Sequence, residues 1–78
     1  MKPDEAELLA KIRQRGAVMG PETPGAWQIA ESLGMPYKRA QYILRDKWGD
    51  KKGWYEYGVS WRYGWLTPEG WAETENLV

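Results

Sequence analysis

The stretch QIAESLGMPYKRAQYILRDK, residues 28–47, decides the fold of this 78-residue chain. In its first half Ile29, Ala30 and Leu33 recur at helical spacing. Apolar residues at this spacing form one stripe along a helix, and such a stripe is normally buried. The sequence therefore predicts an amphipathic helix over about 24–33.

The two halves of the stretch are separated by Gly34 and Pro36. Glycine takes positive φ at little cost and so favours a helix end, whereas proline suits the first turn of a new helix. We therefore expect a tight turn and a second helix over about 36–47. Its inward face is apolar and consists of Ala40, Ile43 and Leu44.

The opposite face of the second helix carries polar and aromatic side chains: Tyr37, Lys38, Gln41, Tyr42 and Arg45. Cations of this kind pair with phosphates, and amides can donate to and accept from base edges. The face is therefore a candidate DNA-binding surface. The alternative is an ordinary corner between two helices with a solvated basic face.

The stretch resembles a helix-turn-helix motif. Five positions match what this motif requires of its first helix, its turn and its second helix, namely Ala30, Gly34, Met35, Ala40 and Ile43. Pro36 departs from it by standing where a Ser or Thr cap is common. Proline removes the side-chain cap but fixes φ, at a cost of about 1 kcal/mol.

The composition excludes most catalytic chemistry. The chain has no cysteine and no histidine, so thiolate and imidazole sites for nucleophilic catalysis or metal binding are absent. It also lacks a glycine-rich phosphate loop. We expect no enzyme activity, no cofactor, no metal and no small-molecule substrate. Six Trp and five Tyr instead supply large side chains for the core of one domain spanning residues 1–78.

Charge is unevenly distributed although the formal net charge is zero. Residues 36–63 hold seven basic and three acidic side chains, a surplus of four positive charges, and the flanking segments are acidic. Such an asymmetry is typical of an electrostatic footprint for nucleic acid. No apolar run has the length of a membrane span and no signal sequence is evident, so we expect a cytoplasmic protein without membrane contact.

The rest of the chain predicts a helix over 3–15, an apolar run at 17–19 that suits a short strand, and a hairpin over about 54–66. Thr67 and Pro68 then begin a short helical turn, and we expect residues 72–78 to fray. Within the hairpin the turn is expected around residues 58–60. Tyr and Trp alternate through it at one parity, which predicts a largely aromatic face if that parity persists through the turn.

Helix, short strand, helix-turn-helix and hairpin is the element order of the winged helix-turn-helix DNA-binding family, which the whole chain resembles. The run GWLTPEG, residues 64–70, is similar to the segment that closes the wing in bacterial members. Gly64 stands where that segment has an aromatic residue, with Tyr63 and Trp65 beside it. The resemblance implies an α+β fold with a three-helix core and a C-terminal hairpin wing.

The resemblance also implies that the second motif helix enters the major groove while the wing touches the DNA backbone. Arg62, with Lys51 or Lys52, would then lie near phosphates. The expected function is sequence-limited binding of double-stranded DNA, as a transcriptional regulator or a phage- or plasmid-type accessory factor.

Two other functions fit the same residues. The hairpin is so rich in aromatic side chains that it can form a protein partner surface, with Tyr57, Trp61 and Tyr63 as candidates. Binding of single-stranded nucleic acid by stacking on these rings is a third option. Association into a homodimer is compatible with DNA binding and with protein binding.

Overall fold

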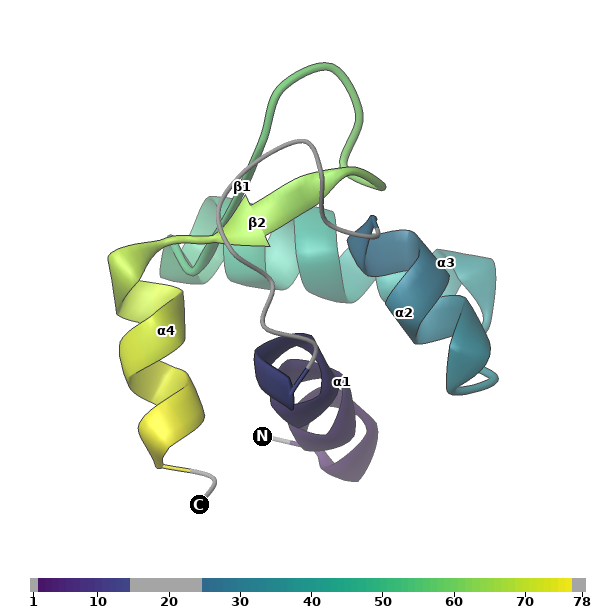
Figure 1. The fold of residues 1–78 in the computed structure, drawn as a ribbon. Coiled ribbons are helices and arrows are strands. Elements are labelled where there is room, and N and C mark those ends of the chain that lie inside the picture. Colours follow the sequence, from purple (N-terminus) through teal and green to yellow (C-terminus); the bar gives the residue numbers. More distant parts are fainter. Residues whose placement is uncertain (1, 15–24, 77–78) are drawn as a thin grey trace.

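The computed structural model describes residues 2–14 and 25–76. Figure 1 shows helices packed with a two-stranded antiparallel hairpin, which confirms the α+β class predicted from the sequence. In chain order the elements are α1 (Pro3–Gln14), α2 (Ala26–Ser32), α3 (Tyr37–Gln41), η1 (Tyr42–Lys52), β1 (Tyr55–Tyr57), β2 (Gly64–Leu66) and α4 (Pro68–Glu75). The predicted strand at 17–19 lies outside the described residues.

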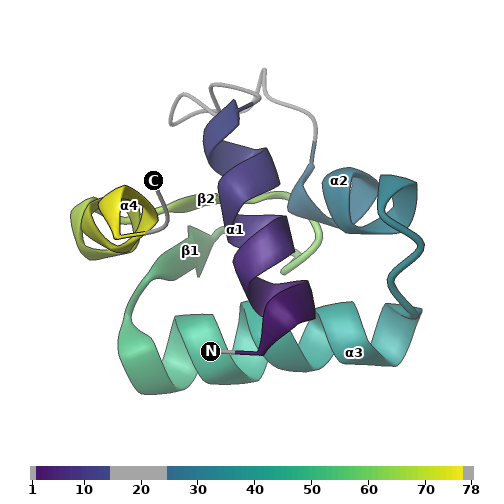
Figure 2. The same cartoon turned by 90° about the horizontal axis from the view of Figure 1, so that it is seen from below.

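Helix α1 follows the prediction closely. Acids occupy its first turn and Lys11 and Arg13 its last, which complements the helix dipole. Its buried stripe consists of Glu5, Leu8, Leu9 and Ile12. Figure 2 shows α1 crossing the rod formed by α3 and η1, with α2 and α4 on either side.

The turn between α2 and α3 has the predicted geometry. Gly34 adopts φ +77°, and its N–H donates to the carbonyl of Glu31. The N–H of Met35 donates to the carbonyl of Ala30, which completes a Schellman motif, and Met35 is buried. Helix α2 begins at Ala26, two residues later than predicted, with Gly25 as its N-cap.

The second motif helix is longer than predicted. It passes from α3 directly into η1, a π-helical segment that ends at Lys52, beyond the predicted end at residue 47. Trp48 is fully buried, and the polar residues after it lie on the solvent side of the continuing helix. Gly53, at φ +68°, supplies the left-handed residue that ends the helix.

The hairpin corrects two predictions. Tyr55 pairs with Leu66 and Glu56 with Trp65, so Trp65 lies on the face opposite Tyr55 and Tyr57. The expected aromatic face is therefore wrong, because the six residues between the strands, 58–63, shift the parity. These residues form a loop rather than the short turn expected at 58–60.

Helix α4 replaces most of the tail that was expected to fray. Thr67 caps it as predicted, since its Oγ accepts from the N–H of Gly70 at 3.1 Å. The helix continues to Glu75 because Thr74 is buried and accepts a hydrogen bond from Arg13 at 2.8 Å. A Cβ on Gly70 would clash with the carbonyl oxygen of Trp54, so glycine permits the close approach of α4 to the hairpin.

None of the helices among residues 2–14 and 25–76 is both long and apolar enough to cross a membrane.

Candidate nucleic-acid interface

The predicted face of the second motif helix, which spans α3 and the start of η1, lies at the surface. Tyr37 is 45 % exposed and Tyr42 is 38 % exposed, and Lys38 between them is also exposed. Gln41 and Arg45 are half-buried. The opposite side of the rod is closed, because Ala40, Ile43 and Leu44 are fully buried. Tyr37, Lys38 and Tyr42 are thus exposed to solvent, whereas Gln41 and Arg45 are only partly exposed.

An aromatic cluster joins the hairpin loop to the start of α3. The ring of Tyr37 meets those of Trp27 and Trp61 edge-on, with centroids 5.1 and 5.3 Å away, and the two tryptophan rings are 6.2 Å apart. In addition, the N–H of Trp27 donates to the carbonyl of Arg62 at 3.2 Å. Edge-to-face contacts of this kind stabilise by about 0.5–1.5 kcal/mol each. The cluster fixes the loop, and with it Arg62, beside the N-terminal end of α3.

Trp61 is therefore a core residue, and its place in the predicted partner surface is wrong. It is only 7 % exposed. Its backbone is held as well, because the buried hydroxyl of Tyr55 donates to the Trp61 carbonyl at 2.7 Å. Burial raises the pKa of Tyr55, which keeps this hydroxyl protonated as a donor. Of the other two candidates, Tyr57 is half-buried and Tyr63 is 58 % exposed.

Ion pairs with α1 neutralise part of the positive surplus on the rod. Arg39 Nε lies 2.8 Å from Asp4 Oδ2, and Lys47 Nζ lies 2.7 Å from Glu5 Oε1. The hydrogen bond from Arg39 lowers the pKa of Asp4. Arg39 and Lys47 belong to the positive surplus of residues 36–63 that suggested nucleic-acid binding. In the structure these two cations instead hold α1 against the rod.

Arg45 is also paired, in this case with its neighbour. Its Nε lies 2.8 Å from Asp46 Oδ1, and both side chains are more than a third exposed. This hydrogen bond lowers the pKa of Asp46. Since exposed pairs are worth about 0–1 kcal/mol, Arg45 can exchange this carboxylate for a phosphate at little cost.

Four cations of the predicted site, Lys38, Lys51, Lys52 and Arg62, form no ion pair with any carboxylate in the described part of the chain. Three of them lie over aromatic rings. Lys51 lies 5.9 Å from the centroid of Tyr42, Lys52 lies 5.5 Å from that of Trp54, and Arg62 lies 5.7 Å from that of Tyr63. Such contacts position a cation without using its N–H donors, and the ammonium groups of Lys51 and Lys52 stay available to an anion.

One row of residues along the rod changes from basic to acidic. Lys38 and Tyr42 are followed at intervals of four residues by Asp46 and Asp50, and all four are at least partly exposed. In a helix residues at this interval share a face, so the basic, aromatic start of the row leads into an acidic end. Along this row Lys38 and Tyr42, at the N-terminal end, are therefore the residues that suit a polyanion.

Arg62 belongs to a structured part of the hairpin loop. Its backbone N–H and its Nε both donate to Ser60 Oγ at 3.3 Å. Arg62 and Tyr63 are exposed, as is Val59, which the sequence did not single out. The loop thus presents one cation and two apolar side chains to solvent.

Comparison with known proteins gives no match to a family model, to a curated protein or to a solved structure.

Proposed function

We propose that this chain is a small winged helix protein that binds double-stranded DNA, with the N-terminal half of the rod in the major groove and the hairpin loop against the backbone. The observation that carries the proposal is the start of the rod, where Tyr37, Lys38 and Tyr42 are exposed and the ring of Tyr37 contacts Trp61, the neighbour of Arg62 in the hairpin loop. Recognition helices of this kind contact bases mainly through their N-terminal residues.

The charge pattern supports one orientation of the rod. Lys38 would meet a phosphate or a base edge directly, with Gln41 beside it as amide donor and acceptor. Asp46 and Asp50 would be repelled by phosphates, so the C-terminal half of the rod is expected to lean out of the groove. Lys51 and Lys52 at its end would approach the backbone from outside.

The same charges predict weak binding by a single copy. If Lys38, Lys51, Lys52 and Arg62 each meet one phosphate, the logarithm of the binding constant should fall against that of the salt concentration with a slope of about −3.6, because each contact contributes about −0.9. Specific affinity at physiological salt would then require a second copy or a further partner. This agrees with a role as a regulator or accessory factor within a larger assembly.

The proposal is tested by fluorescence anisotropy of a labelled random-sequence duplex, titrated at several salt concentrations. Lys38→Ala should weaken binding and reduce the magnitude of the slope by about one unit. The matched control is Lys11→Ala, which removes the same charge from α1, outside the proposed site. If wild type does not bind, or if both variants behave alike, the assignment fails.

A protein partner on the hairpin loop remains the second candidate. Val59 and Tyr63 are the observation that favours it, since both are exposed apolar residues on one loop. Light scattering of the protein alone and with duplex DNA separates the two functions. Self-association that Tyr63→Ser abolishes, with no DNA binding, would favour the partner surface.

A further inference from the structure

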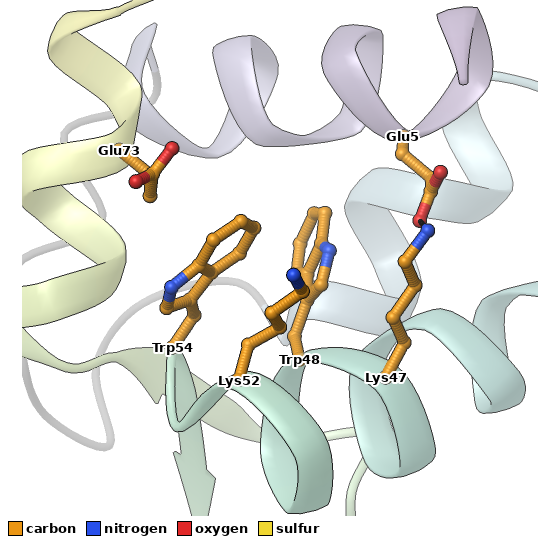
Figure 3. A pocket seen from close by; sticks show the side chains of 6 residues that line it. All are labelled: Glu5, Lys47, Trp48, Lys52, Trp54 and Glu73. Carbon is orange, nitrogen blue, oxygen red and sulfur yellow. Dashed lines mark ion pairs between the residues drawn. The ribbon is translucent and has the colours of Figure 1, made fainter. Parts of the chain in front are cut away.

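A pocket of about 400 Å³ lies on the side of the rod away from the α3 surface. Figure 3 shows its lining, which comes from α1, η1, the start of the hairpin and α4: Glu5, Lys47, Trp48, Lys52, Trp54 and Glu73. This volume falls within the range of sites for small ligands. Of these residues only Lys52 belongs also to the proposed DNA surface.

Trp48 brings an unpartnered donor to this pocket. Its side chain is fully buried, yet its Nε1–H has no acceptor among the described residues. Figure 3 shows this nitrogen on the edge of the ring that faces Lys47 and Glu5. A buried donor without an acceptor costs about 1–3 kcal/mol, so an acceptor on a bound molecule would recover that free energy.

The charged groups of the pocket divide into one ion pair, whose Glu5 Oε1 makes no hydrogen bond within the described residues, and two groups outside it. Glu5 and Lys47 neutralise each other at 2.7 Å. Lys52, by contrast, only lies over the ring of Trp54, and Glu73 only accepts a long hydrogen bond from Asn76 at 3.3 Å. Figure 3 shows Trp54 between these two groups, so an aromatic surface separates one available cation from one available carboxylate.

We propose that this pocket binds a small zwitterion, a free α-amino acid. Its carboxylate would accept from Trp48 Nε1–H and from the ammonium of Lys52, its ammonium would donate to Glu73, and its side chain would pack on Trp54. A simple anion would meet the unneutralised charge of Glu73. A simple cation would leave the Trp48 donor without an acceptor.

The test is a protein NMR titration that follows the Trp48 indole N–H, assigned by triple-resonance spectra. Each natural L-amino acid is added in turn to millimolar concentration. The best binder is then compared with its N-acetyl derivative, which lacks the ammonium, and its methyl ester, which lacks the carboxylate. We expect a saturable shift of the Trp48 indole signal and at least about tenfold weaker binding of both derivatives, since each loses a hydrogen bond to a charged group.

Glu73→Gln tests the assignment of the ammonium site. It should remove the preference for the free amino acid over its N-acetyl derivative, whereas Glu69→Gln, an exposed change in the same helix, should leave that preference intact. If no amino acid moves the Trp48 signal, the pocket holds only water and the proposal is wrong. It is equally wrong if both derivatives bind as tightly as the parent, or if Glu69→Gln has the same effect as Glu73→Gln.

Discussion

The buried ion pair between Glu5 and Lys47 gives the sharpest stability prediction. Glu5 is fully enclosed, whereas the Lys47 side chain is 28 % exposed, and their charged atoms are 2.7 Å apart. Lys47→Met keeps most of the stem of the side chain but removes the charge. Glu5 would keep only the Lys2 backbone N–H at 2.9 Å and the guanidinium of Arg39 at 3.9 Å.

The expected cost is about 3 kcal/mol at pH 7. Removing one partner of a buried pair typically costs about 3–5 kcal/mol, and the partners that remain place this case at the lower end. Alternatively the carboxyl takes up a proton, which at pH 7 costs about 3.4 kcal/mol from its ordinary pKa of 4.5. Both routes remove a large part of a total stability of roughly 4–12 kcal/mol for a domain of this length.

Arg45→Met is the matched control. It also breaks a short ion pair, Arg45 with Asp46 at 2.8 Å, on the same rod, but both of these side chains are more than a third exposed. It should cost less than about 1 kcal/mol. Urea unfolding followed by tryptophan fluorescence should lower the midpoint by about 1–3 M for Lys47→Met and by far less for the control, with unchanged m-values. Equal losses in the two variants would refute the reasoning.

The cost of Lys47→Met should also depend on pH. Burial opposes ionisation of Glu5, but the hydrogen bonds from Lys47 and the Lys2 backbone outweigh it, so the pKa of Glu5 is lowered in the folded protein. A lowered pKa contributes stability above the ordinary value of 4.5, and this contribution is lost as the pH falls through the folded value. The difference between wild type and Lys47→Met should therefore be largest at neutral pH and shrink below about pH 4.5. A difference that is constant with pH would contradict this account.

Three further changes test the fold. Gly34→Ala should cost about 1 kcal/mol or more, because the residue must keep φ +77° although its side chain meets nothing within 4 Å; the drop in melting temperature measures it. Gly70→Ala should destabilise despite the better helix propensity of alanine, since its Cβ collides with the Trp54 backbone; a gain in stability in urea would contradict the packing. Tyr55→Phe should cost about 1–3 kcal/mol by orphaning the Trp61 carbonyl, and hydrogen exchange should quicken first in the hairpin loop.

The local geometry of the helix-turn-helix was predictable from the sequence. Gly34, Met35 and Ala30 form a turn whose hydrogen bonds connect residues at most five positions apart. Its requirements, a left-handed glycine and an apolar residue after it, are therefore visible in a short window. Thr67 as the cap of α4 was predictable for the same reason.

Other features depend on the tertiary structure. The polar residues after Trp48 suit a loop and the exposed side of a helix equally well, so the continuation of η1 to Lys52 was not visible. The face of Trp65 depends on the length of the hairpin loop, which the strand pattern does not contain. The pairing of Lys47 with Glu5 joins segments far apart in the chain, and it changes which cations are left for DNA.

The central proposal is that the N-terminal half of the rod and the hairpin loop together meet duplex DNA. A chemical-shift titration of the labelled protein with a random-sequence duplex tests it most directly. The account predicts salt-sensitive shifts concentrated at Tyr37–Tyr42 and at residues 58–63, with α1 and α4 unmoved. Shifts on α1 and α4, or no shifts at low salt, would contradict it.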